Sequence, residues 1–168
     1  LLNNHIIYSN KPNIWILVPN DINSRKWDSF GSRTSKKLNV PFVNMCIDSI
    51  VKRCGNDFTI NIIKDSSFSE FLPDWKYTVK HAPDIEKDKL RKLGLLKLVY
   101  YYGGLIVPCS FLCFKSLKPL YDLGLQQTEL FIVENKINYC SKYKYAPDLE
   151  FIGCNKQSNI MERVIQFM

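Results

Sequence analysis

The chain has 168 residues and a mass of 19.6 kDa, with 46% hydrophobic and 23% charged residues. A chain of this length forms one compact domain, and this composition excludes a disordered or collagen-like protein. No apolar run approaches the roughly 20 residues that a membrane-spanning helix needs. The sequence begins with Leu1 and ends at Met168 within a predicted helix, so we expect residues 1–168 to be a single domain cut from a longer polypeptide.

The net charge is +7, which attracts phosphate-bearing partners through a general electrostatic field. The basic residues are nevertheless scattered along the chain. Their densest cluster, Lys87, Lys89, Arg91 and Lys92, falls on one predicted helix among acidic residues, and we interpret it as a solvated face. No basic stripe with interleaved aromatic residues lies on one element, so nucleic acid is not an expected partner.

The six cysteines contain no Cys-x-x-Cys pair, and neither His5 nor His81 lies near a cysteine pair in the sequence. This spacing argues against a zinc site. A chain of this size can bury a core without disulfides, so we expect buried free thiols and a reducing compartment such as the cytoplasm.

The first half of the chain alternates between strand and helix patterns. Residues 14–18 form a short apolar run that is typical of a strand buried on both faces. The polar segment 21–37 is a long loop, and long loops in compact domains usually carry function. Asn39 caps a predicted helix that ends at Gly55, and residues 58–64 alternate as a second strand.

Three more helices are predicted from their boundary residues. Residues 67–70 resemble a capping box, which predicts a short helix. Asp84 caps a longer helix that Gly103 ends. The last helix is capped by Ser158, and its inward face is predicted to include Met161, Val164, Ile165 and Met168.

Further strands are predicted to begin at Leu105 and to cover residues 130–133 and 149–152. Strands that alternate with helices favour right-handed crossovers, so we predict a Rossmann-like α/β fold with one mostly parallel sheet and helices on both faces. The strands near Ile14, Phe58 and Leu105 should be neighbours in this sheet.

Ligands of such sheets bind beyond the carboxyl ends of the strands. Residues 19–23, 65–67 and 108–110 follow three predicted strands and form the candidate site, although each is also an ordinary turn segment. Asp65 is the candidate catalytic acid. The other interpretation is that Asp65 caps the helix that follows.

The sequence Tyr-Gly-Gly-Leu-Ile-Val at 102–107, preceded by a helix rich in Leu and Tyr and followed by Lys-Pro-Leu at 118–120, resembles family 32 glycosyltransferases and related capsular polysaccharide synthesis proteins. Phe-Ile-Gly at 151–153 and the closing helix extend this resemblance over about residues 12–168. The chain is also similar to glycosyltransferase-like proteins of large DNA viruses. The resemblance implies a fold of the GT-A type and a nucleotide-sugar ligand, and it adds a virion to the compartments expected.

The chain departs from this family where the chemistry lies. In the family, an Asp-x-Asp motif after the Gly-Gly strand holds a divalent metal, but those positions are Pro108 and Ser110 here. Magnesium prefers carboxylate oxygens. The acid and base of the preceding helix are also missing, because Lys92 and Leu95 stand at their positions. We therefore expect no metal and no other cofactor.

Three functions follow from this departure. The first is a catalytically degenerate domain that binds a ligand or serves as a scaffold. The second is an active, metal-independent transferase whose fixed cations stabilise the leaving diphosphate. The third is a structural component of a larger, viral assembly, for which the tyrosines of segment 139–145 suit a protein interface. Asn20, Asp21 and Ser110 lie in the segments after the predicted strands and are candidate contacts with the nucleotide-sugar. Arg25, Arg33 and Lys97 are the candidate fixed cations of the second function.

Overall fold

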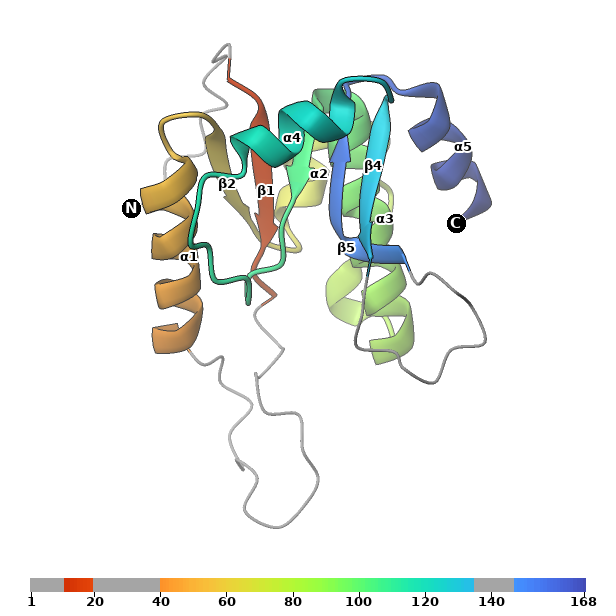
Figure 1. The fold of residues 1–168 in the computed structure, drawn as a ribbon. Coiled ribbons are helices and arrows are strands. Elements are labelled where there is room, and N and C mark those ends of the chain that lie inside the picture. The colour runs from red at the N-terminus through yellow and green to blue at the C-terminus, as the bar shows by residue number, and fades with distance from the viewer. Residues whose placement is uncertain (1–10, 20–39, 135–146) are drawn as a thin grey trace, which may run out of the picture.

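A computed structural model describes residues 11–19, 40–134 and 147–168. Its described residues form an α/β fold with one open five-stranded sheet in the order β2-β1-β3-β5-β4 (Figure 1). The strands are Asn13–Leu17 (β1), Thr59–Ile63 (β2), Gly104–Ile106 (β3), Leu130–Glu134 (β4) and Pro147–Cys154 (β5). The helices are Val40–Cys54 (α1), Ser67–Phe71 (α2), Asp84–Tyr102 (α3), Lys118–Leu125 (α4) and Asn159–Phe167 (α5), with a 3-10 turn at Val79–His81 (η1).

The first three strands are neighbours and run parallel, as the sequence predicts. In the register of the sheet, Ile14 of β1 lies between Ile60 of β2 and Leu105 of β3. The helices α1 and α3 supply the crossovers that parallel pairing requires. The carboxyl ends of all three strands therefore lie at one edge of the sheet.

The prediction of a mostly parallel sheet is wrong for the half of the sheet that contains β5 and β4. Strand β5 pairs antiparallel with both β3 and β4, so the sheet is mixed. Between β4 and β5 the sequence of residues 135–146 shows no helical pattern that would make a crossover. A parallel pair of consecutive strands needs a crossover connection, so a sequence without a helical pattern favours the antiparallel pairing that β4 and β5 show.

Helices cover both faces of the sheet (Figure 1), and the two-residue period of β1 divides the core between them. Ile14 and Ile16 point to the face covered by α1 and α4, where they pack with Ile50 and Phe58. Trp15, only 1% exposed, points to the opposite face, where α2, α3 and α5 pack. The apolar run at 14–18 is thus buried on both sides.

The inward face predicted for helix α1, Val43, Ile47, Ile50, Val51 and Cys54, is confirmed only in part, because Val51 is 46% exposed and Cys46 is buried. Val43, Cys46, Ile50 and Cys54 recur every three or four residues, and all four side chains are buried. The helix ends where the backbone N–H of Gly55 donates a hydrogen bond to the carbonyl oxygen of Val51.

Two predicted helix caps are wrong. Ser67 does not cap its helix, because its hydroxyl oxygen accepts a hydrogen bond from the backbone N–H of Lys64 instead (3.1 Å). The turn between β2 and α2 is therefore stabilised rather than the helix start. Asp84 is the first helical residue of α3, and Pro83 stands at the capping position. The carboxylate of Asp84 pairs with Lys87.

The C-terminal helix α5 is capped as predicted, since the Ser158 hydroxyl accepts a hydrogen bond from the backbone N–H of Met161 (3.2 Å). Met161 is fully buried, whereas Met168 is 49% exposed and does not join the predicted inward face. Helix α4 has no counterpart in the prediction, although Pro119 in its first turn is a common start signal. Among the described helices, none combines the length and apolar character needed to cross a bilayer.

The Tyr-Gly-Gly sequence forms a tight junction between α3 and β3. Gly103 and Gly104 both have positive φ angles, 70° and 111°, which L side chains rarely adopt. A Cβ atom at Gly104 would overlap the carbonyl oxygen of Asn13. The indole N–H of Trp15 donates a hydrogen bond to the carbonyl oxygen of Gly103 (3.0 Å), which fixes the end of α3 against β1.

This junction generates a prediction about stability. Gly104→Ala should lower the free energy of unfolding by about 3 kcal/mol, because it adds backbone strain and a steric overlap with β1. Urea unfolding followed by far-UV circular dichroism measures the change. The exposed substitution Ser110→Ala serves as the control, with an expected change within about 0.5 kcal/mol. Equal stabilities of the two variants would contradict the prediction.

Candidate functional site

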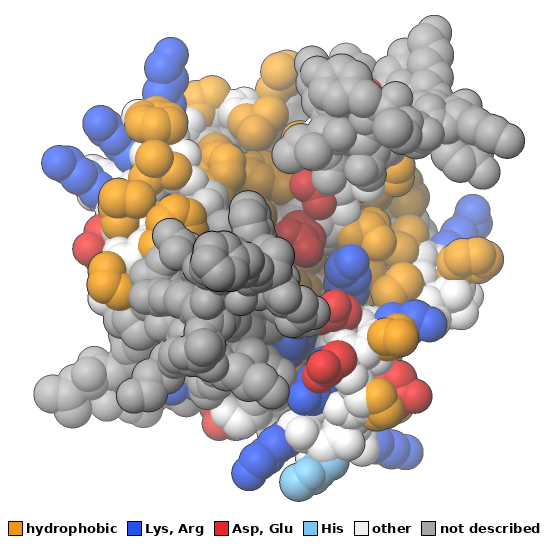
Figure 2. All heavy atoms as spheres, turned by 90° about the horizontal axis from the view of Figure 1, so that it is seen from below, with side chains coloured by type: hydrophobic (Ala, Val, Ile, Leu, Met, Phe, Trp, Pro, Cys, Tyr) orange, Lys and Arg blue, Asp and Glu red, His pale blue; other side chains and the backbone are white. Residues whose placement is uncertain are grey.

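The predicted site segments follow strands that end at the same edge of the sheet. The backbone N–H of Val18 donates a hydrogen bond to the carbonyl oxygen of Ile63 (2.9 Å). The backbone N–H of Val107 donates a hydrogen bond to the backbone carbonyl oxygen of Trp15 (3.1 Å). Residues 65–67 and 108–110 therefore begin at this carboxyl edge. Figure 2 looks onto the edge from below and shows acidic and basic side chains interspersed among apolar ones.

Asp65, the candidate catalytic acid, is bound on both carboxylate oxygens by one buried arginine. Arg91 of α3 donates from Nε to Oδ1 at 2.8 Å and from Nη2 to Oδ2 at 2.6 Å. Arg91 is only 5% exposed, so the prediction that it belongs to a solvated face is wrong. A carboxylate held this way is an anchor between β2 and α3, and it is neither a free base nor a helix cap.

The turn after β3 offers different chemistry. The backbone N–H of Phe111 donates to the carbonyl oxygen of Pro108 (3.0 Å), and Ser110 in this turn is exposed. Cys109 is half-buried against the Ile14 face of the core, and burial raises the pKa of its thiol. The turn thus presents one neutral hydroxyl, and its cysteine stays protonated at neutral pH.

The two parts of the predicted site face opposite sides of the sheet. Asp65 turns toward α3 on the Trp15 face, whereas Cys109 and Phe111 pack on the Ile14 face. Lys97 lies on α3 about 9 Å farther along the helix axis than Arg91, away from the carboxyl edge.

Four residues predicted to contact the nucleotide-sugar lie outside the described residues: Asn20, Asp21, Arg25 and Arg33. The tyrosines of segment 139–145 also lie outside them.

A pocket that sequence reasoning missed opens beside Asp65. It has a volume of about 670 Å³ and lies between the end of β2, segment 75–80 and the start of α3. No residue of β1 or β3 lines it. Its lining includes four lysines and two aromatic side chains: Lys64, Lys76, Lys80, Lys87, Trp75 and Tyr77.

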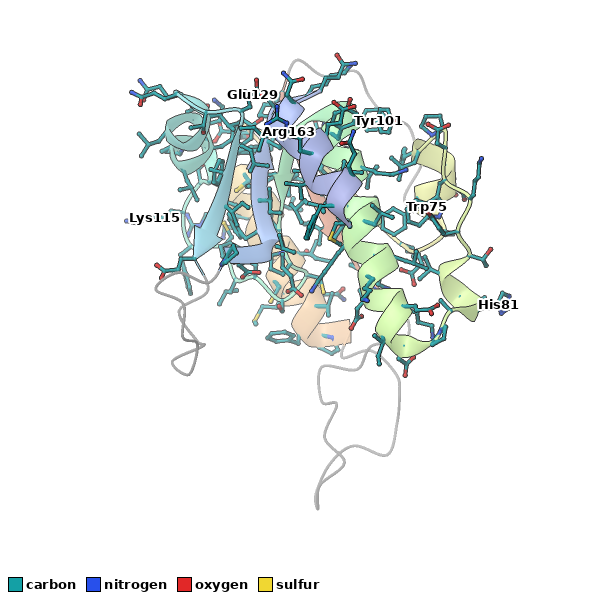
Figure 3. All side chains as sticks on the ribbon, turned by 90° about the vertical axis from the view of Figure 1, so that its right-hand side faces the viewer. Trp75, His81, Tyr101, Lys115, Glu129 and Arg163 are labelled. Atoms are coloured by element: carbon teal, nitrogen blue, oxygen red, sulfur yellow. The ribbon has the colours of Figure 1, made fainter. Side chains whose placement is uncertain are left out.

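Trp75 and Tyr77 form the aromatic wall of this lysine-lined pocket, and the wall packs against the hydrophobic core. Trp75 is half-buried, and its ring centroid lies 5.0 Å from that of the fully buried Phe68 and 5.2 Å from that of Tyr77. Figure 3 shows Trp75 on the connection between α2 and η1, beside α3. The alternation of aromatic and basic residues in Trp75-Lys76-Tyr77 is the sequence signal that could have found this pocket.

The described cysteines and acids do not assemble into a metal site. Among residues 11–19, 40–134 and 147–168, no three His, Cys, Asp or Glu side chains gather where they could hold a metal ion. The five described cysteines are free. Cys54 and Cys113 have their sulfur atoms 3.8 Å apart, and burial raises the pKa of the Cys113 thiol to about 11. These two thiols are buried packing groups.

Comparison with protein-family models, with curated proteins and with solved structures found no match. The function therefore has to be argued from the residues of this chain.

The buried ion pair generates the second prediction. Asp65→Asn should destabilise the fold by about 3 kcal/mol, because it removes the charge of the carboxylate that binds the buried guanidinium of Arg91 through two hydrogen bonds. The double variant Asp65→Leu with Arg91→Met should lose less stability than the single one, since both charges are removed together. Thermal and urea unfolding measure both.

The matched control is Asp88→Asn. Asp88 also approaches Arg91, at 3.8 Å, but its carboxylate is 60% exposed, so its loss should cost no more than about 0.5 kcal/mol. A cost for Asp65→Asn no larger than that for Asp88→Asn would show that the pair is not an anchor.

Proposed function

We propose that this chain is a glycosyltransferase-like domain that has lost metal-dependent catalysis and binds a phosphate-bearing ligand of the nucleotide-sugar class. One observation carries the proposal: the only carboxylate predicted to act, Asp65, has both oxygens bound by Arg91.

The fold supports the resemblance at two points. The three parallel strands β2, β1 and β3 have helical crossovers, which suits a nucleotide-binding half-fold. The Tyr-Gly-Gly sequence makes a junction that only glycine tolerates, so its presence has a structural reason.

The chemistry of the site argues against an ordinary metal-dependent transferase. Transfer of a sugar develops negative charge on the departing diphosphate, and catalysis requires a positive group to stabilise that charge. A divalent metal needs hard oxygen ligands, and Pro108 has no side-chain oxygen while Ser110 has one neutral oxygen. The positions of the Asp-x-Asp motif therefore supply no charged ligand.

A second candidate function is a metal-independent transferase, and the lysine-lined pocket is the observation that favours it. Lys64 follows β2 directly and is exposed, so it places a fixed cation near the carboxyl edge. Fixed cations can replace a metal in stabilising a leaving diphosphate. This function requires a further group to assist attack at the sugar, and Asp65 is not free for that role.

Turnover distinguishes the two functions. The purified protein should neither hydrolyse nor transfer sugar from common nucleotide-sugars, with manganese or with chelator, because Arg91 binds both oxygens of Asp65 and the Asp-x-Asp positions hold Pro108 and Ser110. Release of nucleoside diphosphate in a coupled assay is the measurement. Robust release in chelator would overturn the degenerate reading and establish the metal-independent enzyme.

Placing aspartates at positions 108 and 110 tests whether the lost carboxylates are what prevents metal binding there. Pro108→Asp with Ser110→Asp should create manganese-dependent stabilisation of about 2 to 3 kcal/mol at a metal concentration near one hundred times the dissociation constant. Without metal, the two carboxylates repel each other, and the variant should be less stable than the parent. Thermal unfolding with manganese and with chelator measures both effects.

Pro108→Asn with Ser110→Asn is the matched control, since it has the same shape but no charge. It should show no manganese-dependent shift. An equal shift in the Asn and Asp variants would contradict a carboxylate-dependent site.

A further inference from the structure

We propose that the lysine-lined pocket between β2, α2 and α3 is a binding site for a phosphate chain, with Trp75 and Tyr77 stacking on a ring attached to that chain. This inference does not rest on the transferase resemblance. The pocket shares Asp65 and Ser66 with the predicted site, but none of its lining residues comes from β1 or β3 or from the segment 108–110.

The charges of the pocket are poorly compensated. Lys64, Lys76 and Lys80 have no ion-pair partner among the described residues, while Lys87 lies 3.3 Å from Asp84. The one carboxylate in the lining belongs to Asp65, and Arg91 already neutralises it. Four ammonium groups around one concavity raise the local positive potential, and this potential favours a multiply charged anion.

The lysines of the pocket come from different elements, and in this they differ from a run of charges on one solvated helix face. Lys64 follows a strand, Lys76 and Lys80 belong to the connection that ends in η1, and Lys87 lies on α3. Folding therefore brings together cations that are up to 23 positions apart in the sequence. The volume of about 670 Å³ is that of an ordinary small-molecule site.

The aromatic wall indicates a ring beside the anionic part of the ligand. Tyr77 is 50% exposed, and Trp75 behind it is held by contact with buried Phe68, so the tyrosine ring has a fixed support. An exposed aromatic face beside cations binds planar rings by stacking. The hydroxyl groups of Ser66 and Thr78 also line the pocket and can donate to phosphate oxygens.

Calorimetric titration of the whole chain tests the site with three probes at physiological ionic strength: tripolyphosphate, ATP and adenosine. Tripolyphosphate and ATP should bind with one-to-one stoichiometry, and adenosine should bind much more weakly because it lacks the phosphate chain. Absence of saturable binding of both phosphate probes by the unmodified protein would overturn the proposal.

A pair of double variants separates a local site from the general charge of the chain. Lys76→Gln with Lys80→Gln should weaken tripolyphosphate binding about tenfold, because two charge-assisted contacts are lost. Lys89→Gln with Lys156→Gln removes the same charge from exposed positions outside the pocket, and binding should change by no more than about twofold. Equal losses in the two double variants would show attraction by net charge alone and would overturn the proposal.

Tyr77→Ala tests the ring contact. This exposed substitution should weaken ATP binding severalfold and leave tripolyphosphate binding unchanged. Equal effects on both probes would remove the stacking part of the proposal. Because tripolyphosphate carries no sugar, its binding is independent of turnover, so failure of the proposed transferase-like function and failure of this pocket give different results.

Discussion

The ion pair between Asp65 and Arg91 is the contact on which the arrangement of this region depends. It joins the end of β2 to the first half of α3 with two hydrogen bonds, at 2.8 and 2.6 Å, and the arginine is buried. A buried charge without its partner is costly, so the pair holds strand and helix at a fixed separation. The lysine-lined pocket opens beside this pair, and Asp65 is both a member of the pair and a lining residue of the pocket. The same contact that shapes the pocket removes Asp65 from acid or base chemistry.

The junction at Gly103 and Gly104 is the second constraint, and it acts at the opposite edge of the sheet. The end of α3 approaches β1 so closely that Trp15 donates to a backbone carbonyl of the junction. Helix α3 is thus fixed at two points, by the junction at its last turn and by Arg91 two to three turns earlier. Its side chains Leu96, Leu98 and Val99 are buried against the sheet between these points. The pocket residue of α3, Lys87, lies one turn before Arg91.

Sequence reasoning predicted the parts of the fold that depend on local pattern. The apolar run at 14–18 and the cap at Ser158 each follow from neighbouring residues, and the structure confirms them. It failed where distant residues decide. The burial of Arg91 depends on Asp65, which is 26 positions away. A basic residue among Lys87, Lys89 and Lys92 has the local pattern of a solvated face, and only the partner across the fold reverses that reading.

The lysine-lined pocket shows the same limit for the candidate site. In the sequence its cations look scattered, and the charge of +7 indicates only a general field. Folding places four of them around one cavity, and like charges that lie close together repel each other. An anion that enters the cavity relieves this repulsion and binds the folded state alone, so ligand binding and fold stability are linked by mass action. Binding of this kind would need no metal, because the ammonium groups of the lysines supply the positive charge.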